Sequence, residues 1–213
     1  MIQMLRYLFF ILIVRPVVLV ILGLNVRHKE RLLTRGPAII VANHNSHLDT
    51  LVLMTIFPLK LLPIIRPVAA RDYFCSNRFL NWFSLNIMNI IPLERTLSSY
   101  HNDPLENITK SLTEGHIVII YPEGTRGEPE QMSKFKTGIV HLVKRHPDIP
   151  VFPVFMHGLG KALPKGEGIL VPFFCDIFLG EPMYWTGDRD TFMNELNSRM
   201  HALAAEGHFP TWH

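Results

Sequence analysis

A histidine and an aspartate five positions apart are the residues whose types and spacing best suit catalysis. The stretch from Val41 to Thr50 reads VANHNSHLDT and contains His44 and Asp49. If a helix begins near Asn45, the carboxylate lies roughly one turn beyond the imidazole. Asp49 can then accept a hydrogen bond from one ring nitrogen, fix the tautomer, and leave the other nitrogen as a base. The spacing predicts a general-base dyad that deprotonates an alcohol.

Three other interpretations compete for the same stretch. A His and an Asp at a helix start can simply be two polar residues with satisfied hydrogen bonds. A metal site could use His44, His47 and Asp49, but the H-E-x-x-H spacing and a further Cys/His cluster are absent from the sequence. A serine hydrolase would need Ser46 or Ser84 as nucleophile, and the chain contains no G-x-S-x-G motif. The activated hydroxyl is therefore expected to belong to the substrate, and no metal or organic cofactor is expected.

A second stretch with chemical potential reads YPEGTRG, from Tyr121 to Gly127. Pro122 ends the apolar run before it, and Gly124 allows the backbone to approach a ligand closely. Arg126 offers a planar guanidinium that suits phosphate. The stretch predicts an anion site, with an ordinary solvated turn as the alternative.

These stretches, in this order, resemble the glycerolipid acyltransferase family of the lysophosphatidic acid acyltransferase type. The family's N-H-x4-D motif matches Asn43, His44 and Asp49, and its P-E-G-T-R motif matches Pro122 to Arg126. Glu94 stands where an aspartate is common in the family's arginine block. The resemblance extends over roughly residues 22 to 185 and includes Pro92 to Arg95, Ile149 to Val154 (IPVFPV), Gly36 to Ala42, Phe135 to Gly138 and Gly180 to Pro182.

The resemblance implies a role for each matched residue. His44 would be the base and Asp49 its orienting partner, whereas the block from Ile149 to Val154 is associated with the acyl donor and the core. The phosphate-bearing acceptor would be held by Arg95, Glu123, Gly124, Thr125 and Arg126.

The same resemblance implies an O-acyltransferase of phospholipid biosynthesis. A fatty acyl group would pass from acyl-CoA or acyl-carrier protein to 1-acylglycerol 3-phosphate, a lysophospholipid acceptor, giving phosphatidic acid. Transfer to another lysolipid or to glycerol 3-phosphate is an alternative. A non-catalytic membrane lipid-binding protein of the same fold is another, although such a protein would not need a base.

The elements that must position these residues alternate between strands and helices. Short runs rich in β-branched residues predict strands, and helical periodicity with capping and stop residues predicts helices. This alternation is typical of an α/β layered domain, here residues 27–213, with a largely parallel central sheet flanked by helices. The predicted strands are Ala38–Ala42, Ile64–Ala69, Ile117–Tyr121, Val151–Met156 and Ile169–Leu179, and the predicted helices are Asp103–Glu114, Phe135–His146 and Thr191–Ala205.

An apolar helical segment precedes this domain and is expected to attach residues 1–26 to a membrane. The run from Tyr7 to Val26 is about as long as a bilayer-spanning helix, which takes roughly 20 residues. Arg15 and Pro16 interrupt it, so two short legs or an interfacial helix compete with a straight span. A cleaved signal peptide and a buried core helix are further alternatives. The cytoplasmic face, of the inner membrane if the source is bacterial, is predicted by the basic residues Arg27, Lys29, Arg31 and Arg35.

The composition of the 213 residues fits a protein that contacts lipid. Hydrophobic residues make up 48% and the mean hydropathy is +0.19, both high for a chain wholly in water. Residues 1–80 hold ten Lys and Arg against three Asp and Glu, and the remainder holds eleven against fifteen. Nucleic acid is not an expected partner, because no recognition motif accompanies the basic half. Two separated cysteines, Cys75 and Cys175, do not indicate a disulfide framework.

Overall fold

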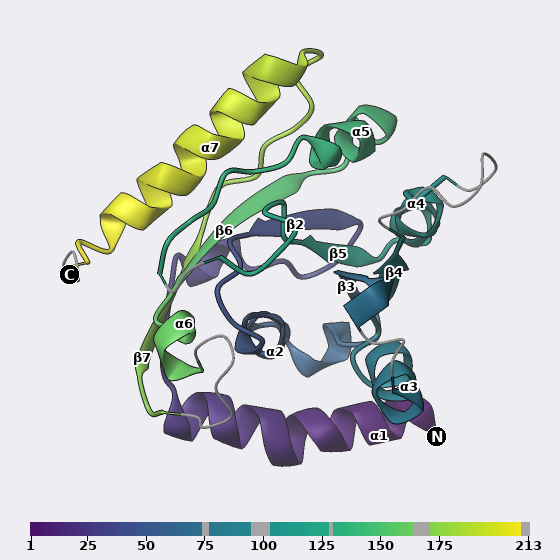
Figure 1. Ribbon diagram of the computed structural model, residues 1–213, viewed down its shortest axis with the longest axis vertical. Helices are drawn as coiled ribbons and strands as arrows, with labels where there is room; N and C mark the ends of the chain where they lie inside the picture. The colour runs from purple at the N-terminus through teal and green to yellow at the C-terminus, as the bar shows by residue number, and fades with distance from the viewer. Residues whose placement is uncertain (74–76, 95–102, 128–129, 164–170, 210–213) are drawn as a thin grey trace.

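A seven-stranded sheet separates two layers of helices in the computed structural model, which describes residues 1–73, 77–94, 103–127, 130–163 and 171–209 (Figure 1). Within these residues the strand order is β1-β7-β6-β2-β5-β3-β4. Neighbouring strands are parallel except for the antiparallel pair β6 and β7. The strands are β1 (Gly23–Arg27), β2 (Ala38–Ala42), β3 (Ile65–Ala70), β4 (Ile91–Leu93), β5 (Ile117–Ile120), β6 (Val151–His157) and β7 (Phe174–Leu179).

The helices divide between the two faces of this sheet (Figure 1). One face carries the N-terminal helix (Ile2–Ile21), α2 (Leu48–Ile56) and α3 (Arg78–Asn86). The other carries α4 (Glu106–Thr113), α5 (Gly138–Arg145) and α7 (Arg189–Glu206). Short helical turns complete the chain at Lys29–Arg31, Leu59–Leu61, Arg71–Tyr73 and Leu159–Ala162, the last labelled α6.

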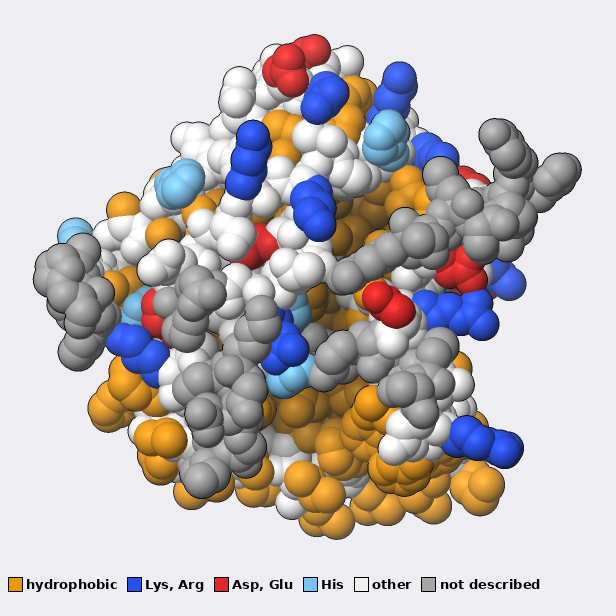
Figure 2. Space-filling view, viewed as in Figure 1, with side chains coloured by type: hydrophobic (Ala, Val, Ile, Leu, Met, Phe, Trp, Pro, Cys, Tyr) orange, Lys and Arg blue, Asp and Glu red, His pale blue; other side chains and the backbone are white. Residues whose placement is uncertain are grey.

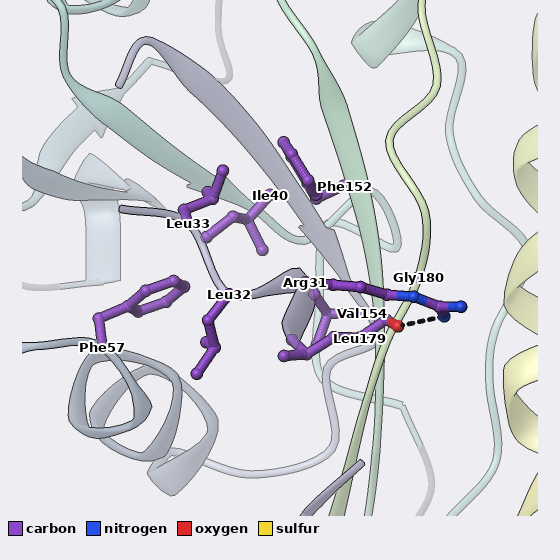
Figure 3. A pocket seen from close by; sticks show the side chains of 9 residues that line it. All are labelled: Arg31, Leu32, Leu33, Ile40, Phe57, Phe152, Val154, Leu179 and Gly180. Atoms are coloured by element: carbon purple, nitrogen blue, oxygen red, sulfur yellow. Dashed lines mark hydrogen bonds between the residues drawn. The ribbon is translucent and has the colours of Figure 1, made fainter. Parts of the chain in front are cut away.

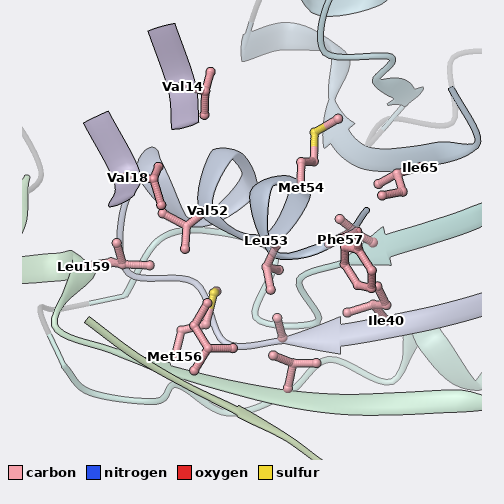
Figure 4. Close-up of a cluster of buried hydrophobic side chains, with 14 of the residues drawn as sticks. Val14, Val18, Ile40, Val52, Leu53, Met54, Phe57, Ile65, Met156 and Leu159 are labelled. Carbon is pink, nitrogen blue, oxygen red and sulfur yellow. The ribbon is translucent and has the colours of Figure 1, made fainter. Parts of the chain in front are cut away.

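The central strand β2 is buried on both faces. Its sequence AIIVA is rich in β-branched residues, which favour strands. Because side chains alternate along a strand, Ile40 packs into the cluster beneath α2 and the N-terminal helix, whereas Ile39 and Val41 pack toward α5 and α7. Figure 4 shows Val14 and Val18 of the N-terminal helix near Val52 of α2 in the first cluster. Two cores therefore hold β2, and the loop that follows it, in a fixed position.

The structure confirms the layered α/β fold with a largely parallel sheet. The predicted strands Ala38–Ala42, Ile117–Tyr121 and Val151–Met156 appear as β2, β5 and β6, within one residue at each end. The last strand begins only at Phe174, and the earlier part of its predicted range includes residues 169–170, outside the described residues. Two edge strands, β1 and β4, were not predicted, because their short runs lack a clear strand pattern.

The N-terminal helix continues through Arg15 and Pro16 without a break. Pro16 has helical dihedrals, with φ −58° and ψ −44°, and π-helical turns at Phe10–Val14 and Val17–Ile21 lie on either side of it. A π turn widens the helix locally and can accommodate a proline that would otherwise break α-helical hydrogen bonding. The helix ends at Ile21, so residues 23–26, which the sequence analysis grouped with this segment, belong to β1 in the sheet.

Candidate active site

The two motifs singled out in the sequence follow neighbouring parallel strands. Asn43 to Asp49 come directly after β2, and Pro122 to Arg126 follow β5, which pairs with β2 in the sheet. The carboxyl ends of parallel strands lie at the same edge, where α/β proteins place their ligand sites. The topology thus brings the predicted base and the predicted anion site together.

His44 and Asp49 form the predicted pair. The Nδ1 atom of His44 lies 2.8 Å from Oδ2 of Asp49. The same carboxylate oxygen accepts the main-chain N–H groups of Asn45 at 2.7 Å and Ser46 at 2.9 Å. Asp49 is completely buried in the first turn of α2, whereas the His44 side chain is 21% exposed. The carboxylate is held by three donors, which assigns the proton of the neutral imidazole to Nδ1 and the lone pair to Nε2.

A partly buried tyrosine supports the imidazole from the side. The ring of Tyr121 stacks on His44 with centroids 4.2 Å apart and planes 21° apart. Its hydroxyl lies 2.9 Å from Oγ1 of Thr50. Burial raises the pKa of Tyr121 well above its ordinary value, and the nearby charge of Asp49 raises it further. Tyr121 therefore stays neutral and orients His44 by packing and not by charge.

Glu123 joins the two motif loops through the main chain. One of its carboxylate oxygens accepts the N–H of His44 at 2.9 Å, and the other accepts the N–H of Ser133 at 3.1 Å. In return the carbonyl of His44 accepts the N–H of Gly127 at 3.0 Å. Glu123 is only 3% exposed, and this burial raises its pKa. Through these hydrogen bonds, Glu123 fixes the loop after β2 relative to the loop after β5.

Asn43 anchors the end of β2 to the adjacent strand β6. Its side-chain amide donates to the carbonyl of Met156 at 2.8 Å, and its amide oxygen accepts the N–H of Met156 at 2.7 Å. The residue is buried. From the sequence, Asn43 has no expected role beyond its place in the motif. Its position directly after a buried strand was the only signal for such an anchor.

Glu130 connects the second motif loop to the end of β6, a contact that sequence reasoning missed. Its carboxylate accepts the N–H groups of Gly158 at 2.7 Å and Gly160 at 3.0 Å. It also lies 3.5 Å from Nε2 of His157, whose ring stacks on Phe209. Glu130 adopts a left-handed φ of 61°, a conformation that favours glycine. The hydrogen bonds to Gly158 and Gly160 therefore stabilise Glu130 in an unfavourable backbone conformation.

The serine considered as a nucleophile has another partner. The Ser46 hydroxyl donates to the carbonyl of Leu163 at 3.0 Å and accepts the N–H of Leu48 at 3.3 Å. Ser84 is buried within α3. Neither geometry resembles a nucleophile hydrogen-bonded to His44. Within the described part of the chain, no three His, Cys, Asp or Glu side chains are grouped so that they could hold a metal ion.

Positive charge accumulates beside the dyad. Burial lowers the pKa of His47, and the nearby positive charge of Arg126 lowers it further. Arg126 is half-buried, Thr125 is exposed, and Gly124 adopts a left-handed φ of 75°. Arg95 lies outside the described residues, as do Cys75 and Trp212. The described cations at this edge of the sheet suit an anionic ligand.

A small apolar pocket lies away from this site (Figure 3). It is bounded by strands β2, β6 and β7 and by the segment before β2, and Ile40 at its wall precedes His44 by four residues. Neither His44 nor Asp49 is among the described residues that line the pocket. The side chain of Arg31 closes one side by donating to the carbonyl of Leu179 at 2.9 Å. The pocket is therefore separate from the dyad.

Comparisons with known proteins agree with the motifs and with the fold. A chloroplastic 1-acyl-sn-glycerol-3-phosphate acyltransferase of Arabidopsis thaliana is 28% identical over 77% of this chain and 44% of its own length. A 1-acyl-sn-glycerol-3-phosphate acyltransferase of Pseudomonas aeruginosa is 27% identical over 80% of this chain and 63% of its own. The chain thus spans about half the length of these curated relatives.

A solved structure shares the fold. The 1-acyl-sn-glycerophosphate acyltransferase PlsC of Thermotoga maritima superposes with a TM-score of 0.73, covering 96% of this chain and 79% of that one at 19% identity. The model of the acyltransferase family matches residues 23–157, which include the dyad, the second motif and six of the seven strands. The chain therefore belongs to the acyltransferase family.

Proposed function

We propose that the protein transfers a fatty acyl group from acyl-CoA or acyl-carrier protein to the free hydroxyl of 1-acylglycerol 3-phosphate, giving phosphatidic acid. The observation that carries the proposal is the geometry of the dyad. Asp49 holds Nδ1 of His44 at 2.8 Å, which leaves Nε2 of a partly exposed imidazole to accept a proton. Cationic groups next to this base, and relatives named for 1-acylglycerol-3-phosphate acylation, support a phosphate-bearing acceptor.

The reaction proceeds by direct transfer. As Nε2 of His44 removes the proton of the acceptor hydroxyl, the oxygen attacks the thioester carbonyl and forms a new C–O bond. The carbonyl becomes a tetrahedral oxyanion, and its collapse breaks the C–S bond. The thiolate leaves and is protonated by the imidazolium of His44. The buried charge of Asp49 balances the imidazolium while it exists.

The main-chain amides around the site suggest where the oxyanion is stabilised. The N–H groups of Asn45 and Ser46, at the start of the loop after β2, already donate to Asp49. Among the hydrogen bonds between described residues, none uses the N–H of Thr125 or Arg126. Unpaired donors that are fixed in place are what an oxyanion requires. We therefore assign this role to the turn after Gly124.

The proposal is tested by assaying the purified protein with a panel of acceptors. The panel contains radiolabelled 1-acylglycerol 3-phosphate, glycerol 3-phosphate and a lysophospholipid with a larger headgroup, each offered with acyl-CoA and with acyl-carrier protein. Phosphatidic acid is expected as the dominant product with at least one donor. If only another acceptor were acylated, that acceptor would be the substrate in place of 1-acylglycerol 3-phosphate. No transfer to any acceptor would overturn the proposed enzyme function.

Replacing Arg126 by alanine is expected to weaken acceptor binding specifically. A charge-assisted contact to phosphate contributes roughly 1.5 to 3 kcal/mol, which corresponds to an acceptor KM higher by about 10 to 150-fold. Arg126→Lys keeps the charge but not the bidentate geometry. Its acceptor KM should therefore fall between those of wild type and Arg126→Ala. The measurement is KM for acceptor and donor in each variant.

The control for Arg126 is Arg189→Ala, which removes a largely exposed arginine at the start of α7. This control should leave both KM values within about twofold of wild type, as expected for an exposed charge remote from the site. Equal rises in donor and acceptor KM for Arg126→Ala would argue against a phosphate contact. The predicted partnership of Arg126 with Arg95 stays a prediction.

We further propose that the N-terminal helix lies flat in the membrane surface. It is long and apolar enough to span a bilayer, yet one of its faces packs on the catalytic domain. Arg6 donates to the carbonyls of Asn86 at 2.7 Å and Ile87 at 2.9 Å, and Arg15 donates to that of Phe57 at 3.4 Å. A span perpendicular to the membrane would break these contacts and place Arg15 near its centre. The cytoplasmic side stays a prediction.

The opposite face of this helix supplies the lipid contact. Figure 2 shows hydrophobic side chains gathered along the lower part of the molecule, where the N-terminal helix and α3 lie in Figure 1. In α3, Phe79 is 70% exposed and stacks near Trp82, and an edge contact between Phe9 and Phe83 joins the two helices. The exposed helix residues include Leu12, Ile13, Leu19 and Val20. Aromatic and aliphatic side chains on adjacent helices form an interfacial surface.

Removing part of this surface is expected to release the protein from lipid. The triple variant Leu12→Ser, Leu19→Ser, Val20→Ser loses three aliphatic side chains, each of which gains about 1.5 to 3 kcal/mol when fully buried. If these side chains insert even partly into the membrane in the wild-type protein, the triple variant should bind anionic vesicles at least tenfold more weakly. Co-sedimentation with the vesicles measures this binding. Tyr184→Ser, which removes an exposed aromatic after β7, is the control and should bind normally. Unchanged binding of the triple variant would contradict the interfacial geometry.

A further inference from the structure

Lys136 lies over the glycine of the second motif. Gly124 adopts φ 75°, and a Cβ atom built on it would lie 2.7 Å from Nζ of Lys136, 3.1 Å from Cε and 3.2 Å from Cδ. The distal part of the lysine side chain therefore occupies space that only glycine leaves open. The sequence analysis expected Gly124 to let a ligand approach the backbone. The structure adds that this glycine lets a cation approach it.

The backbone around Lys136 is anchored although its side chain is exposed. The preceding Phe135 is only 4% exposed and packs in the core beneath α5. The main-chain N–H of Lys136 donates to the carbonyl of Pro122 at 2.8 Å, which ties the residue to the motif itself. Thr137 follows at the start of α5. The fixed backbone therefore positions the Lys136 side chain next to the turn at Gly124.

The charge at this position lacks a counter-ion within the described residues. None of the ion pairs formed there includes Lys136. The nearest motif carboxylate, Glu123, is buried and accepts main-chain N–H groups with both oxygens. Arg126, in the same turn, adds a second positive charge. Two cations beside the same turn favour a ligand with more than one negative charge.

We propose that Lys136 binds the phosphate of the lipid acceptor together with Arg126, an inference that rests on the proposed function. A phosphate monoester carries a charge of about −1.5 to −2 at neutral pH, so a single arginine leaves part of this charge unbalanced. Lysine is a compact point charge on a flexible stem and can follow a phosphate oxygen as the glycerol moves toward His44. Lys136 thus contributes to the choice of a phosphate-bearing acceptor over a neutral one.

The test compares Lys136→Met, Lys136→Arg and Lys134→Met with the full-length wild-type protein. Methionine keeps an unbranched side chain over Gly124 but removes the charge, and arginine keeps the charge. Lys134 is an exposed lysine two residues earlier in the same loop and serves as the matched control. In Lys136→Met the KM for 1-acylglycerol 3-phosphate should rise about tenfold, the lower end for a charge-assisted contact. The donor KM and kcat should change less than twofold, Lys136→Arg should recover most of the loss, and Lys134→Met should match wild type.

A second measurement uses 1-acylglycerol, which lacks the phosphate, as a competitive inhibitor. Its inhibition constant should be the same in wild type and Lys136→Met. An unchanged acceptor KM, an equal rise in donor KM, or an equal loss for Lys134→Met would overturn the assignment. These outcomes differ from failure of the proposed function, in which wild-type protein itself would not acylate 1-acylglycerol 3-phosphate and the inference would fall with it.

Discussion

His44→Ala is expected to lower kcat by about 10²- to 10⁴-fold, the usual contribution of a general base. Neither Tyr121 nor Glu123 can take over the proton transfer. Burial keeps the Tyr121 hydroxyl protonated at neutral pH by raising its pKa, and both oxygens of Glu123 accept main-chain N–H groups. The acceptor KM should change little, because the cations proposed to bind the phosphate remain in place. The measurement is steady-state acyl transfer at saturating donor and acceptor.

The fold of this variant should remain intact. The His44 side chain is partly exposed and makes one hydrogen bond, whereas the loop is held by main-chain contacts to Glu123 and Gly127. Thermal melting should therefore be close to that of wild type. His141→Ala, an exposed histidine of α5, is the matched control and should retain full activity. Near-normal turnover of His44→Ala would remove the base from the mechanism.

Local features of the sequence were sufficient to predict the dyad. His44 and Asp49 are close in the chain, so an apolar strand followed by a helix start was enough to place one near the other. The central strands were predictable for a similar reason. Strands such as β2 are buried on both faces and appear as continuous β-branched runs. Where the relevant contact is local, the residue types alone carry the information.

Contacts between distant segments were not predictable in this way. The side-chain amide of Asn43 contacts Met156, 113 positions away, and the Lys136 side chain lies over Gly124 in the loop after β5. Edge strand β1 is likewise defined by its partner β7 and not by its own residues, GLNVR. Such contacts become visible only when the sheet order is known.

The division of the N-terminal helix into a buried and an exposed face was hidden by its geometry and composition. Its buried residues Arg6, Phe10, Val14, Val18 and Leu22 recur every four positions. In a regular α-helix this spacing drifts around the axis, but the wider π turns at Phe10–Val14 and Val17–Ile21 compensate for part of that drift. Because the exposed side is apolar as well, no polar stripe marked the boundary. The sequence therefore indicated attachment without its orientation.

Asp49→Asn is expected to reduce activity almost as strongly as loss of the base. Oδ2 of Asp49 accepts hydrogen bonds from His44, Asn45 and Ser46, whereas Oδ1 is buried without a partner. Asparagine can place its oxygen at the Oδ2 position, but its NH₂ group then occupies the unpartnered site and the negative charge that balances the imidazolium is gone. In a comparable Ser-His-Asp arrangement, such a change lowers kcat by about 10⁴-fold.

The size of this loss distinguishes an electrostatic role for Asp49 from a merely structural one. Asparagine can still accept the N–H groups of Asn45 and Ser46, so replacing charge-assisted by neutral hydrogen bonds costs about 1 kcal/mol and the melting temperature should fall by only a few degrees. Asp188→Asn, which changes the capping carboxylate of the remote helix α7, should show a similar small drop in melting temperature with normal kcat. If Asp49→Asn loses stability but keeps its kcat, then Asp49 only fixes the loop before α2 through Asn45 and Ser46. If kcat falls by two or more orders of magnitude while the fold persists, the charge of Asp49 acts through His44 in the transition state.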